Sequence, residues 1–559
     1  MKTLNKIFTV AGVLATLSLT SCVKDLDLMP NDPNTVVTPN VEQAMAKCYS
    51  GIAVSGQTGP NGDSDISGLD GGTSQYTRAL FMMNEFTTDE SKWIWNDVGV
   101  SDLNTNTFQA NNANIYGTYS RLYVHIAIVN DFLRHLDEGN IDKGDVDDAT
   151  IAQFRVEARA LRALSYYWAC DLWDKVSFID ETSASGDKPK QISRAQLYTW
   201  LVTELKDIIA NFNDSNIYGR MSKDGVKALL ARLYLNAEVY TGTPAYNECY
   251  SLCQEIIANH TDGYNGTGLV KDYPYLFAGS NSKYMPGGSG THEILWGIPY
   301  HTTNTQPWGG TTFLCVAGLS GSVVKPADYG LNAEWGCMHA TKEFSQKFDF
   351  TKDARSCMWT REPKCNIENT EYTTYTDGYQ VIKFTNLLEG TGPDNVSDWA
   401  ATNGSIATAN PKFWSADNGG NYGTGAARSQ QFPDTDLPLL RLADVYLMAA
   451  ECTLRGAGDM NQGLAYINVV RSRAGLDALT LAHFDLNELL DERCREMYWE
   501  LTRRSDLIRC NKYTGSTYTW AWKNNTNPGG SIDDKYKTFP VPTNVLSAQS
   551  DFEQSEAWK

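Results

Sequence analysis

Two parts of the chain carry apolar residues at helical spacing, and a long segment without that spacing separates them. Apolar side chains recur every three to four positions between residues 112 and 260, and again between residues 436 and 504. Residues 261–435 are instead rich in Gly, Asn, Thr, Trp and Tyr. Long irregular segments of folded proteins are usually functional or disordered. The pattern predicts a mostly α-helical scaffold, split in sequence, with an inserted loop-rich lobe of α+β type.

The periodic stretches predict nine helices, at residues 41–52, 112–137, 146–173, 193–214, 222–241, 244–260, 436–455, 461–473 and 486–504. Ala231–Ala237 is echoed by Leu442–Glu451, with small Ala residues where a neighbouring helix could approach closely. This resembles a tetratricopeptide helix pair, but the intervals are too irregular for a tandem array. We expect embedded helix pairs that form a curved scaffold. Unrelated Ala-rich core helices remain the alternative.

The N-terminus has the pattern of an export signal. Lys2 and Lys6 precede an apolar run, Ile7–Leu19, which is too short to span a bilayer stably. Cys22 follows Ser21 at the end of that run, as at a lipoprotein cleavage site. Several acyl chains on the new N-terminal cysteine would anchor the protein to a membrane surface. We predict a signal peptide at 1–21, lipidation at Cys22 and a Pro-containing tether at 22–40; an ordinary signal peptide with a chance cysteine is the alternative.

Charge and composition narrow the class of partner. The net charge of −19 and the pI near 4.9 argue against nucleic acid or anionic lipid and suit a neutral ligand. The 15 Trp and 29 Tyr serve cores first, but aromatic rings also form flat platforms for ligands. No CxxC pair occurs and the seven His are scattered, which argues against a zinc site. We expect most cysteines to be small buried residues.

Residues 492–509 mix both charge signs at helical spacing. Glu496 and Glu500 are a like-charge pair that repel each other. The attraction between Glu492 and Arg495, and between Glu500 and Arg503 or Arg504, can offset this repulsion. This pattern favours a structural ionic network over a catalytic acid–base site.

A local aromatic cluster suggests a ligand site. Trp93 and Trp95 lie among polar residues in the segment Asp89–Asp97. In an extended chain both indoles would point to the same side. Indoles stack on the C–H faces of neutral sugars while nearby polar groups bind the hydroxyls. Burial of Trp93 in the core is an equal alternative.

Several segments resemble the SusD/RagB family of lipoproteins. They are Phe154–Trp173, Asp434–Tyr446, Glu492–Arg509, and Phe539–Pro542 with Gln554. The resemblance, which with the Cys22 region spans nearly the whole chain, implies four tetratricopeptide-like helix pairs and a loop-rich ligand-binding part. It also implies a role without catalysis: a lid on a TonB-dependent (SusC-like) transporter, lipid-anchored on the outer face of the outer membrane, that captures glycans or, in some members, peptides.

Within that family the chain is similar to the starch-binding founder. The resemblance implies three stacking aromatics, which fall on Trp95, Trp308 and Trp335, and an arginine that binds sugar hydroxyls, which falls on Arg78. A sugar-binding aspartate maps to Asp70. Where the founder has an asparagine beyond its Trp, this chain has Val98, and Asn96 is the candidate to replace it. Three rings in an arc suit the curl of an α-1,4-glucan oligosaccharide or polysaccharide; buried, supporting roles for Trp308 and Trp335 remain the alternative.

The remaining expectations concern domains, cofactors and competing functions. We expect a helical scaffold with a ligand-site loop at 41–260, a loop-rich lobe at 261–435, and scaffold with a C-terminal tail at 436–559. No cofactor is expected; the resemblance to the founder, which binds a structural calcium ion, makes such an ion an option near Asp434 and Asp436, which lie in a similar segment, but it assigns no ligands. The alternatives are another glycan (fructan, xylan or mannan), a peptide, or a glycoside hydrolase, which would need two carboxylates placed across the scissile bond.

Overall fold

The computed structural model describes residues 38–559 except 57, 94, 185, 214–215, 320–325, 327–329, 350–351, 356–370, 375–379, 384–411, 413–430 and 527–528. The predicted signal peptide and Cys22 lie outside the described residues, and of the tether only residues 38–40 are described. Within the described part of the chain, no helix combines the length and apolarity needed to cross a bilayer.

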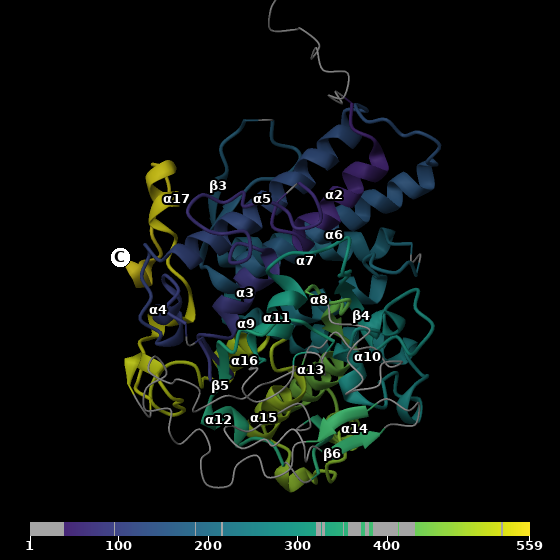
Figure 1. Ribbon diagram of the computed structural model, residues 1–559, viewed down its shortest axis with the longest axis vertical. Helices are drawn as coiled ribbons and strands as arrows, with labels where there is room; N and C mark the ends of the chain where they lie inside the picture. Colours follow the sequence, from purple (N-terminus) through teal and green to yellow (C-terminus); the bar gives the residue numbers. More distant parts are fainter. Residues whose placement is uncertain are drawn as a thin grey trace, which may run out of the picture.

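Most upstream helices follow the predicted stretches (Figure 1), but two short helices, at residues 76–84 and 100–104, lie outside them. They are α2 (Val41–Ala53), α3 (Tyr76–Asn84), α4 (Val100–Asn104), α5 (Ala113–Asp137), α6 (Asp148–Leu172), α7 (Arg194–Asn211), α8 (Lys223–Leu235), α9 (Ala237–Thr241) and α10 (Tyr246–Asn259). Side-chain caps fix several starts: Asn112 accepts N–H bonds at the start of α5, and Ser193 forms a capping box with Gln196 at the start of α7. The expected helix at 222–241 is interrupted at Asn236, which separates α8 from α9.

The downstream helices correct the prediction at two places. Residues 436–455 do not form one helix, because Leu437–Arg441 is strand β8 and α13 (Leu442–Leu454) begins only after it. The helix expected at 486–504 ends early: α15 spans Leu486–Met497, and α16 (Arg503–Arg509) follows a turn. The other helices in this half are α14 (Met460–Arg473) and α17 (Thr543–Ala548).

Neighbouring helices pack in pairs. Helix α5 packs on α6, α8 on α10, and α13 on α14, while α10 also packs on α13. The two Ala-rich echoes are therefore the first helices of two pairs that meet through α10. In Figure 1, α2, α5 and α6 occupy one end of the molecule, and α13, α14 and α15 occupy the opposite end. This arrangement confirms the mostly helical, helix-pair fold.

Short antiparallel two-stranded sheets connect distant parts of the chain. They pair β1 (Ser91–Trp93) with β5 (Met338–Ala340), β2 (Lys175–Phe178) with β3 (Lys190–Ser193), β4 (Ile294–Ile298) with β8, and β6 (Glu371–Thr374) with β7 (Gln380–Lys383). The β4–β8 pair joins the loop-rich segment to the residues that directly follow it. That segment also contains α11 (Gly310–Ala317) and α12 (Lys342–Ser345).

One hydrophobic core runs through both helical parts. A single cluster of buried side chains extends from Val41 in α2 to Phe539 near the C-terminus, and it includes Phe313 and Met338 of the loop-rich segment. The loop-rich segment is therefore packed on the scaffold at α11 and β5, which gives any residues next to these elements a rigid support.

Candidate functional site

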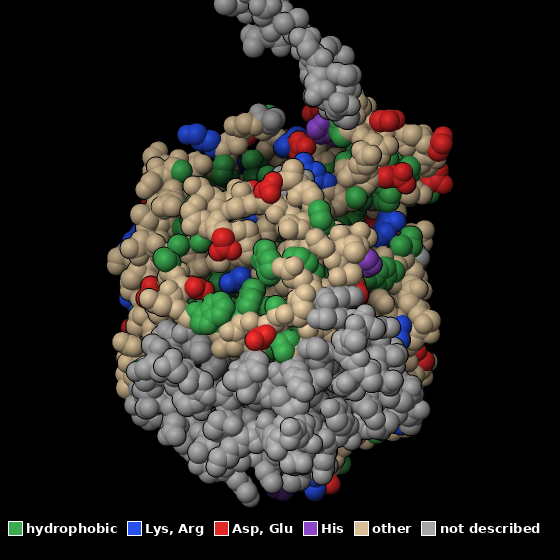
Figure 2. Space-filling view, viewed as in Figure 1, with side chains coloured by type: hydrophobic (Ala, Val, Ile, Leu, Met, Phe, Trp, Pro, Cys, Tyr) green, Lys and Arg blue, Asp and Glu red, His purple; other side chains and the backbone are tan. Residues whose placement is uncertain are grey.

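Three indoles from separate segments lie in a row at the surface. The ring centroids of Trp95 and Trp335 are 6.1 Å apart, and those of Trp335 and Trp308 are 6.3 Å apart. Trp95 is 43% exposed and Trp308 39% exposed, while Trp335 between them is half-buried. Hydrophobic side chains gather in Figure 2 over the region where Figure 1 shows α3, α4 and α11. We call Trp95, Trp335 and Trp308 the indole row.

Strand pairing places Trp95 beside Trp335. Strands β1 and β5 run antiparallel with Trp93 opposite Met338. The pairing brings the two segments together, because Trp95 lies two residues after Trp93 and Trp335 lies three residues before Met338. The backbone N–H of Trp335 donates to the Val316 carbonyl of α11 at 2.8 Å, which fixes this segment to the core.

Trp308 is held at the surface by the tight turn that follows it. Gly310 has a φ of +55°, and a Cβ there would come within 2.3 Å of the Tyr300 ring. A Cβ on Gly309 would likewise meet the Gln75 side chain at 2.4 Å. The backbone can approach the core this closely only with glycine at both positions. Helix α11 then starts directly behind Trp308.

Arg78 lies below the row, on the buried side. Its guanidinium carbon is 5.6 Å from the centroid of the Trp335 ring and 4.9 Å from that of Phe313, within the range of cation–π attraction. Its Nη1 donates to the Trp308 carbonyl at 3.2 Å. Arg78 is 8% exposed and thus ties two of the three indole segments to α3 from below.

The other predicted ligand residues lie close by. A Cβ on Gly72 would be 2.8 Å from Trp308 Cβ, 3.0 Å from Arg78 Nη1 and 3.1 Å from Asp70 Oδ1, so Gly72 lets these groups converge. Asp70 is exposed and accepts from the Gly72 and Thr73 N–H groups at 2.8 and 2.9 Å. Asn96 is exposed, next to Trp95.

Trp93 has a structural environment instead. It is 1% exposed, and its indole N–H donates to Asp97 at 2.8 Å. Strand β1 ends at Trp93. Trp93 supports Trp95 by an edge contact at 5.6 Å between ring centroids.

The segment before β1 is fastened to the turn between α15 and α16. Asp89 accepts from Arg503 Nε and Nη2, each at 2.7 Å. The backbone N–H of Trp499 donates to the Glu90 carboxylate at 3.1 Å, and the backbone N–H of Leu501 donates to the Glu85 carboxylate at 2.8 Å. We call these contacts the carboxylate clamp. Their sequence separation of more than 400 residues hides them from local sequence patterns.

The clamp stabilises an uncommon backbone conformation. Trp499 and Leu501 have φ values of +62° and +67°, in the left-handed region that bulky residues rarely adopt. Such residues cost about 1–3 kcal/mol each and persist where the surroundings fix them. The two clamped N–H groups belong to these two residues.

Electrostatics differ among the three clamp carboxylates. Burial raises the pKa of Asp89, but Arg503 more than offsets this and lowers it to about 2. Burial raises the pKa of Glu90 to about 7, although Arg503 acts in the opposite direction. Burial and the Glu90 carboxylate raise the pKa of Glu85 well above its usual range. The clamp thus contains one carboxylate with a lowered pKa and two with raised pKa values.

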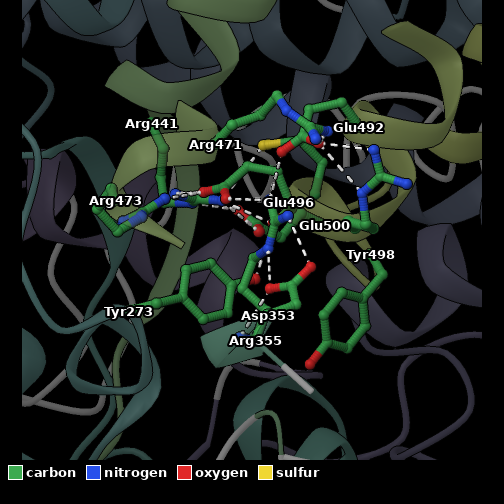
Figure 3. A network of polar contacts seen from close by, with 12 residues as sticks. Tyr273, Asp353, Arg355, Arg441, Arg471, Arg473, Glu492, Glu496, Tyr498 and Glu500 are labelled. Atoms are coloured by element: carbon green, nitrogen blue, oxygen red, sulfur yellow. Dashed lines mark hydrogen bonds and ion pairs between the residues drawn. The ribbon is translucent and has the colours of Figure 1, made fainter. Parts of the chain in front are cut away.

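A buried ionic network lies next to the clamp (Figure 3). Arg441 at the end of β8 bonds to Glu293, Glu496 and Glu500, with distances of 2.6 to 3.0 Å. Arg355 bonds to Asp353 and Glu492 at 2.8 Å each, and to Glu496 at 3.1 Å. We call these residues, with Arg471 and Arg473, the buried ionic network.

The network confirms a structural interpretation of residues 492–509 but corrects the pairing. Glu492 pairs with Arg495 as expected. Glu500 does not pair with Arg503 or Arg504, because α15 ends before it; it pairs with Arg441 and Lys412. Burial raises the pKa of Glu492, but Arg355, Arg495 and Arg471 outweigh burial and lower it to about 2.

The residues considered for calcium are engaged with protein groups. Asp436 accepts from the Tyr218 hydroxyl and the Tyr300 N–H, and Asp434 accepts from the Thr302 N–H. In the described part of the chain, no group of three or more His, Cys, Asp or Glu side chains could hold a metal ion.

Together these features define a class: a helix-pair scaffold that carries a row of aromatic side chains on loops at its surface. Residues 292–558 match the model of the SusD family. The chain is 30% identical to the starch-binding protein SusD of Bacteroides thetaiotaomicron, over 98% of both chains. The protein therefore belongs to the SusD family.

Solved structures agree on the fold. A SusD superfamily protein from Parabacteroides distasonis gives a TM-score of 0.65 at 18% identity, covering 92% of this chain and 98% of its own. Surface glycan-binding protein A from Bacteroides thetaiotaomicron, in complex with laminarihexaose, gives 0.62 at 20% identity, covering 92% and 98%. At these identities the likeness concerns the fold.

Proposed function

We propose that this protein binds starch-type α-glucan oligosaccharides on its indole row and delivers them to a TonB-dependent (SusC-like) outer-membrane transporter. In this proposal Cys22 carries the lipid that holds the protein on the outer face of the outer membrane. Recognition combines stacking on Trp95, Trp335 and Trp308 with hydrogen bonds, and it involves no catalytic step.

The observation that carries the proposal is the arrangement of three exposed or half-exposed indoles with a guanidinium beneath them. Large aromatic side chains are normally buried, so a contiguous exposed row points to a ligand. The planes of Trp308 and Trp335 are 29° from parallel, and those of Trp335 and Trp95 are 39° from parallel. Rings tilted in this way suit a coiled α-1,4-glucan better than a flat β-linked chain.

The chemistry of the surroundings supports a neutral polyhydroxyl ligand. Asp70 and Asn96 are exposed beside the row and can exchange hydrogen bonds with sugar hydroxyls. The relative at 30% identity is named for starch binding, which supports the same ligand class here. The overall charge of −19 disfavours anionic polymers.

Affinity electrophoresis tests the proposal. Native gels that contain amylopectin should retard the wild-type protein, and Trp95→Ala and Trp335→Ala should each migrate as in a gel without glycan. Parallel gels with laminarin, fructan, xylan and mannan identify the ligand class. Unchanged retardation of both variants in amylopectin would refute the proposed site, and retardation only in another glycan would refute the starch assignment.

A further inference from the structure

A cavity of about 750 Å³ lies beside the chain segment that leads to the indole row. Pro299, Asn304 and Thr305 line it, and Trp308 follows three residues after Thr305. Helix α2 and the loop before α8 supply other parts of its wall. None of the three indoles lines this cavity, so it is separate from the row although one segment serves both. Its volume lies within the range of ligand pockets, about 300–1,000 Å³.

Tyr218 exposes an aromatic ring in this cavity. Tyr218 is 42% exposed, close to the 43% of Trp95 and the 39% of Trp308, and these are the only aromatic residues in the described part of the chain that are exposed. The Tyr218 hydroxyl donates to the Asp436 carboxylate at 2.8 Å, which holds the ring by its polar end. A ring fixed in this way is a ready surface on which a ligand can stack.

The loop that carries Tyr218 is fitted closely to the segment that leads to the row. Gly219 has a φ of +78°, and a Cβ there would come within 2.6 Å of Pro299 Cγ. Only glycine allows this approach. Tyr218 and Arg220, on either side of Gly219, are therefore positioned directly against Pro299.

Arg220 presents a fixed donor to the cavity. Its Nε and Nη2 donate to the buried Glu157 carboxylate at 2.8 and 2.6 Å, and its guanidinium carbon is 4.9 Å from the centroid of the Phe154 ring. This side-on pairing leaves Nη1 on the opposite edge of the guanidinium. Nη1 has no hydrogen-bond partner among the described residues, yet solvent reaches it. Arg220 thus offers free N–H groups to an occupant while Glu157 balances its charge.

The charges around the cavity cancel. Arg121 pairs with Asp65 through Nη1 at 3.1 Å, as Arg220 pairs with Glu157. The two remaining charged side chains of the lining are exposed and opposite in sign. They are Lys47 and Glu42. A neutral ligand therefore suits this cavity better than an ion.

A neutral sugar fits the groups that remain available. Its C–H face can stack on the Tyr218 ring, and its hydroxyls can accept from Arg220 Nη1. Asn304 is exposed at the edge of the cavity and can both donate to hydroxyls and accept from them. This combination of an exposed ring with polar side chains repeats the chemistry of the indole row with different residues.

We propose that this cavity is a second glycan-binding site, at which Tyr218 and Arg220 bind one part of an α-glucan polymer while another part lies on the indole row. This inference rests on the proposed function and extends its ligand from oligosaccharides to long chains that contact both sites. A single tyrosine platform binds weakly by itself. A polymer held by the row, however, is present at the cavity at an effective concentration in the mM range, so the second site adds affinity only for a chain that the row already holds.

A comparison of a short and a long ligand tests this. Maltotriose, with one ring for each indole, is titrated by calorimetry, and the affinity for amylopectin is taken from retardation in native gels at increasing amylopectin concentration. Tyr218→Ala should bind maltotriose as the wild type does but bind amylopectin roughly fivefold more weakly. An effective concentration of about 5 mM at a site with a dissociation constant of about 1 mM gives a gain of this size.

The outcomes separate the two proposals. Equal amylopectin affinity in Tyr218→Ala and the wild type would overturn the second site and leave the proposed function intact. An equal loss for maltotriose and amylopectin would also overturn it, because Tyr218 would then act through the row. Failure of the wild type to bind either glycan would overturn both proposals.

Further variants locate the effect in the cavity. Tyr218→Phe, the matched control, keeps the ring and should keep the amylopectin affinity. Ser50 of α2 lines the cavity and is exposed, so Ser50→Trp should cover the mouth and weaken amylopectin binding alone, whereas Ser50→Ala should not. If Tyr218→Ala and Ser50→Trp both unfold at the wild-type urea midpoint and both keep the wild-type amylopectin affinity, the polymer does not enter this cavity.

Discussion

The buried ionic network and the indole row use opposite chemistry in one molecule. The network places Arg441, Glu496 and their partners where solvent does not reach, and each charge is matched by several opposite charges. The row places neutral aromatic side chains at the surface, where their exposed apolar area contributes no burial energy to the fold. We therefore expect the network to stabilise the fold and the row to bind the ligand.

The carboxylate clamp connects the two regions. Asp89 and Glu90 bond to Arg503 and Trp499, a few residues beyond the network glutamates, and β1 follows directly with Trp93. The clamp thus holds the segment that carries Trp95 against the part of the core that the buried ionic network stabilises. If this view is correct, damage to the network, the clamp and the row should separate into three distinct phenotypes.

The largest effect should come from the network. Arg441→Met removes the guanidinium that faces Glu293, Glu496 and Glu500, and it leaves these carboxylates buried with less compensation. Breaking a buried ion pair in this way costs about 3–5 kcal/mol. Urea unfolding should show a loss of that size. The exposed pair Lys352–Asp477 is the control, and Lys352→Ala should leave the unfolding midpoint in place.

A second variant breaks the clamp. Asp89→Asn keeps the shape but removes the charge that Arg503 faces, so we expect a loss of about 1.5–3 kcal/mol in the free energy of unfolding. Because β1 loses its attachment, the affinity for maltoheptaose should fall as well. Folded Asp89→Asn protein that binds with wild-type affinity would show that the clamp does not position the row.

A third variant affects binding alone. Trp308→Ala removes the end of the row that is 39% exposed, so stability should change little. Loss of an aromatic anchor typically weakens binding by about 2 kcal/mol, or roughly 30-fold. Fluorescence titration with maltoheptaose measures the change. A drop in the unfolding midpoint as large as that of Arg441→Met would instead identify Trp308 as a supporting core residue.

The last expected effect is a dependence of stability on pH. The pKa of Glu90 is raised to about 7 in the folded protein, whereas an ordinary glutamate titrates near 4.5. Between these values the folded state holds a proton that the unfolded state has lost, so stability should fall as the pH rises from 5 to 7 and then level off. Urea midpoints at pH 5, 6 and 7 should show the decline, and Glu90→Gln should flatten it. An equal decline in the variant would assign it to other groups.

Local sequence patterns predicted most of the long helices, because these carry their own apolar spacing and many begin at a side-chain cap, as α5 and α7 do. They missed the short helices α3 and α4. These patterns failed where contacts between residues far apart in the sequence determine the secondary structure. Leu437–Arg441 is as apolar as the helix that follows, and it becomes a strand because it pairs with β4. Glu500 follows a helical charge pattern, but α15 ends before it, where the clamp holds Trp499 and Leu501 in the left-handed region.

The site was less accessible to local reasoning than the fold. Trp95, Trp308 and Trp335 are separated by up to 240 residues, and only a family resemblance grouped them before the structure brought them together. Gly72 lets Asp70, Arg78 and Trp308 lie close together because it has no side chain. In the sequence, nothing distinguishes it from other glycines. Asp89 and Arg503 likewise form opposite halves of one ion pair across most of the chain.

The central claim is that the exposed indoles bind the glycan while the buried ionic network stabilises the fold. Calorimetric titration of maltoheptaose into Trp95→Ala, paired with the urea unfolding curve of this variant, tests it most directly. Leu481→Ala removes another exposed apolar side chain and is the matched control. We expect Trp95→Ala to lose detectable binding and to unfold at the wild-type midpoint, while Leu481→Ala retains both. Wild-type affinity in Trp95→Ala, or loss of binding only together with unfolding, would contradict the account.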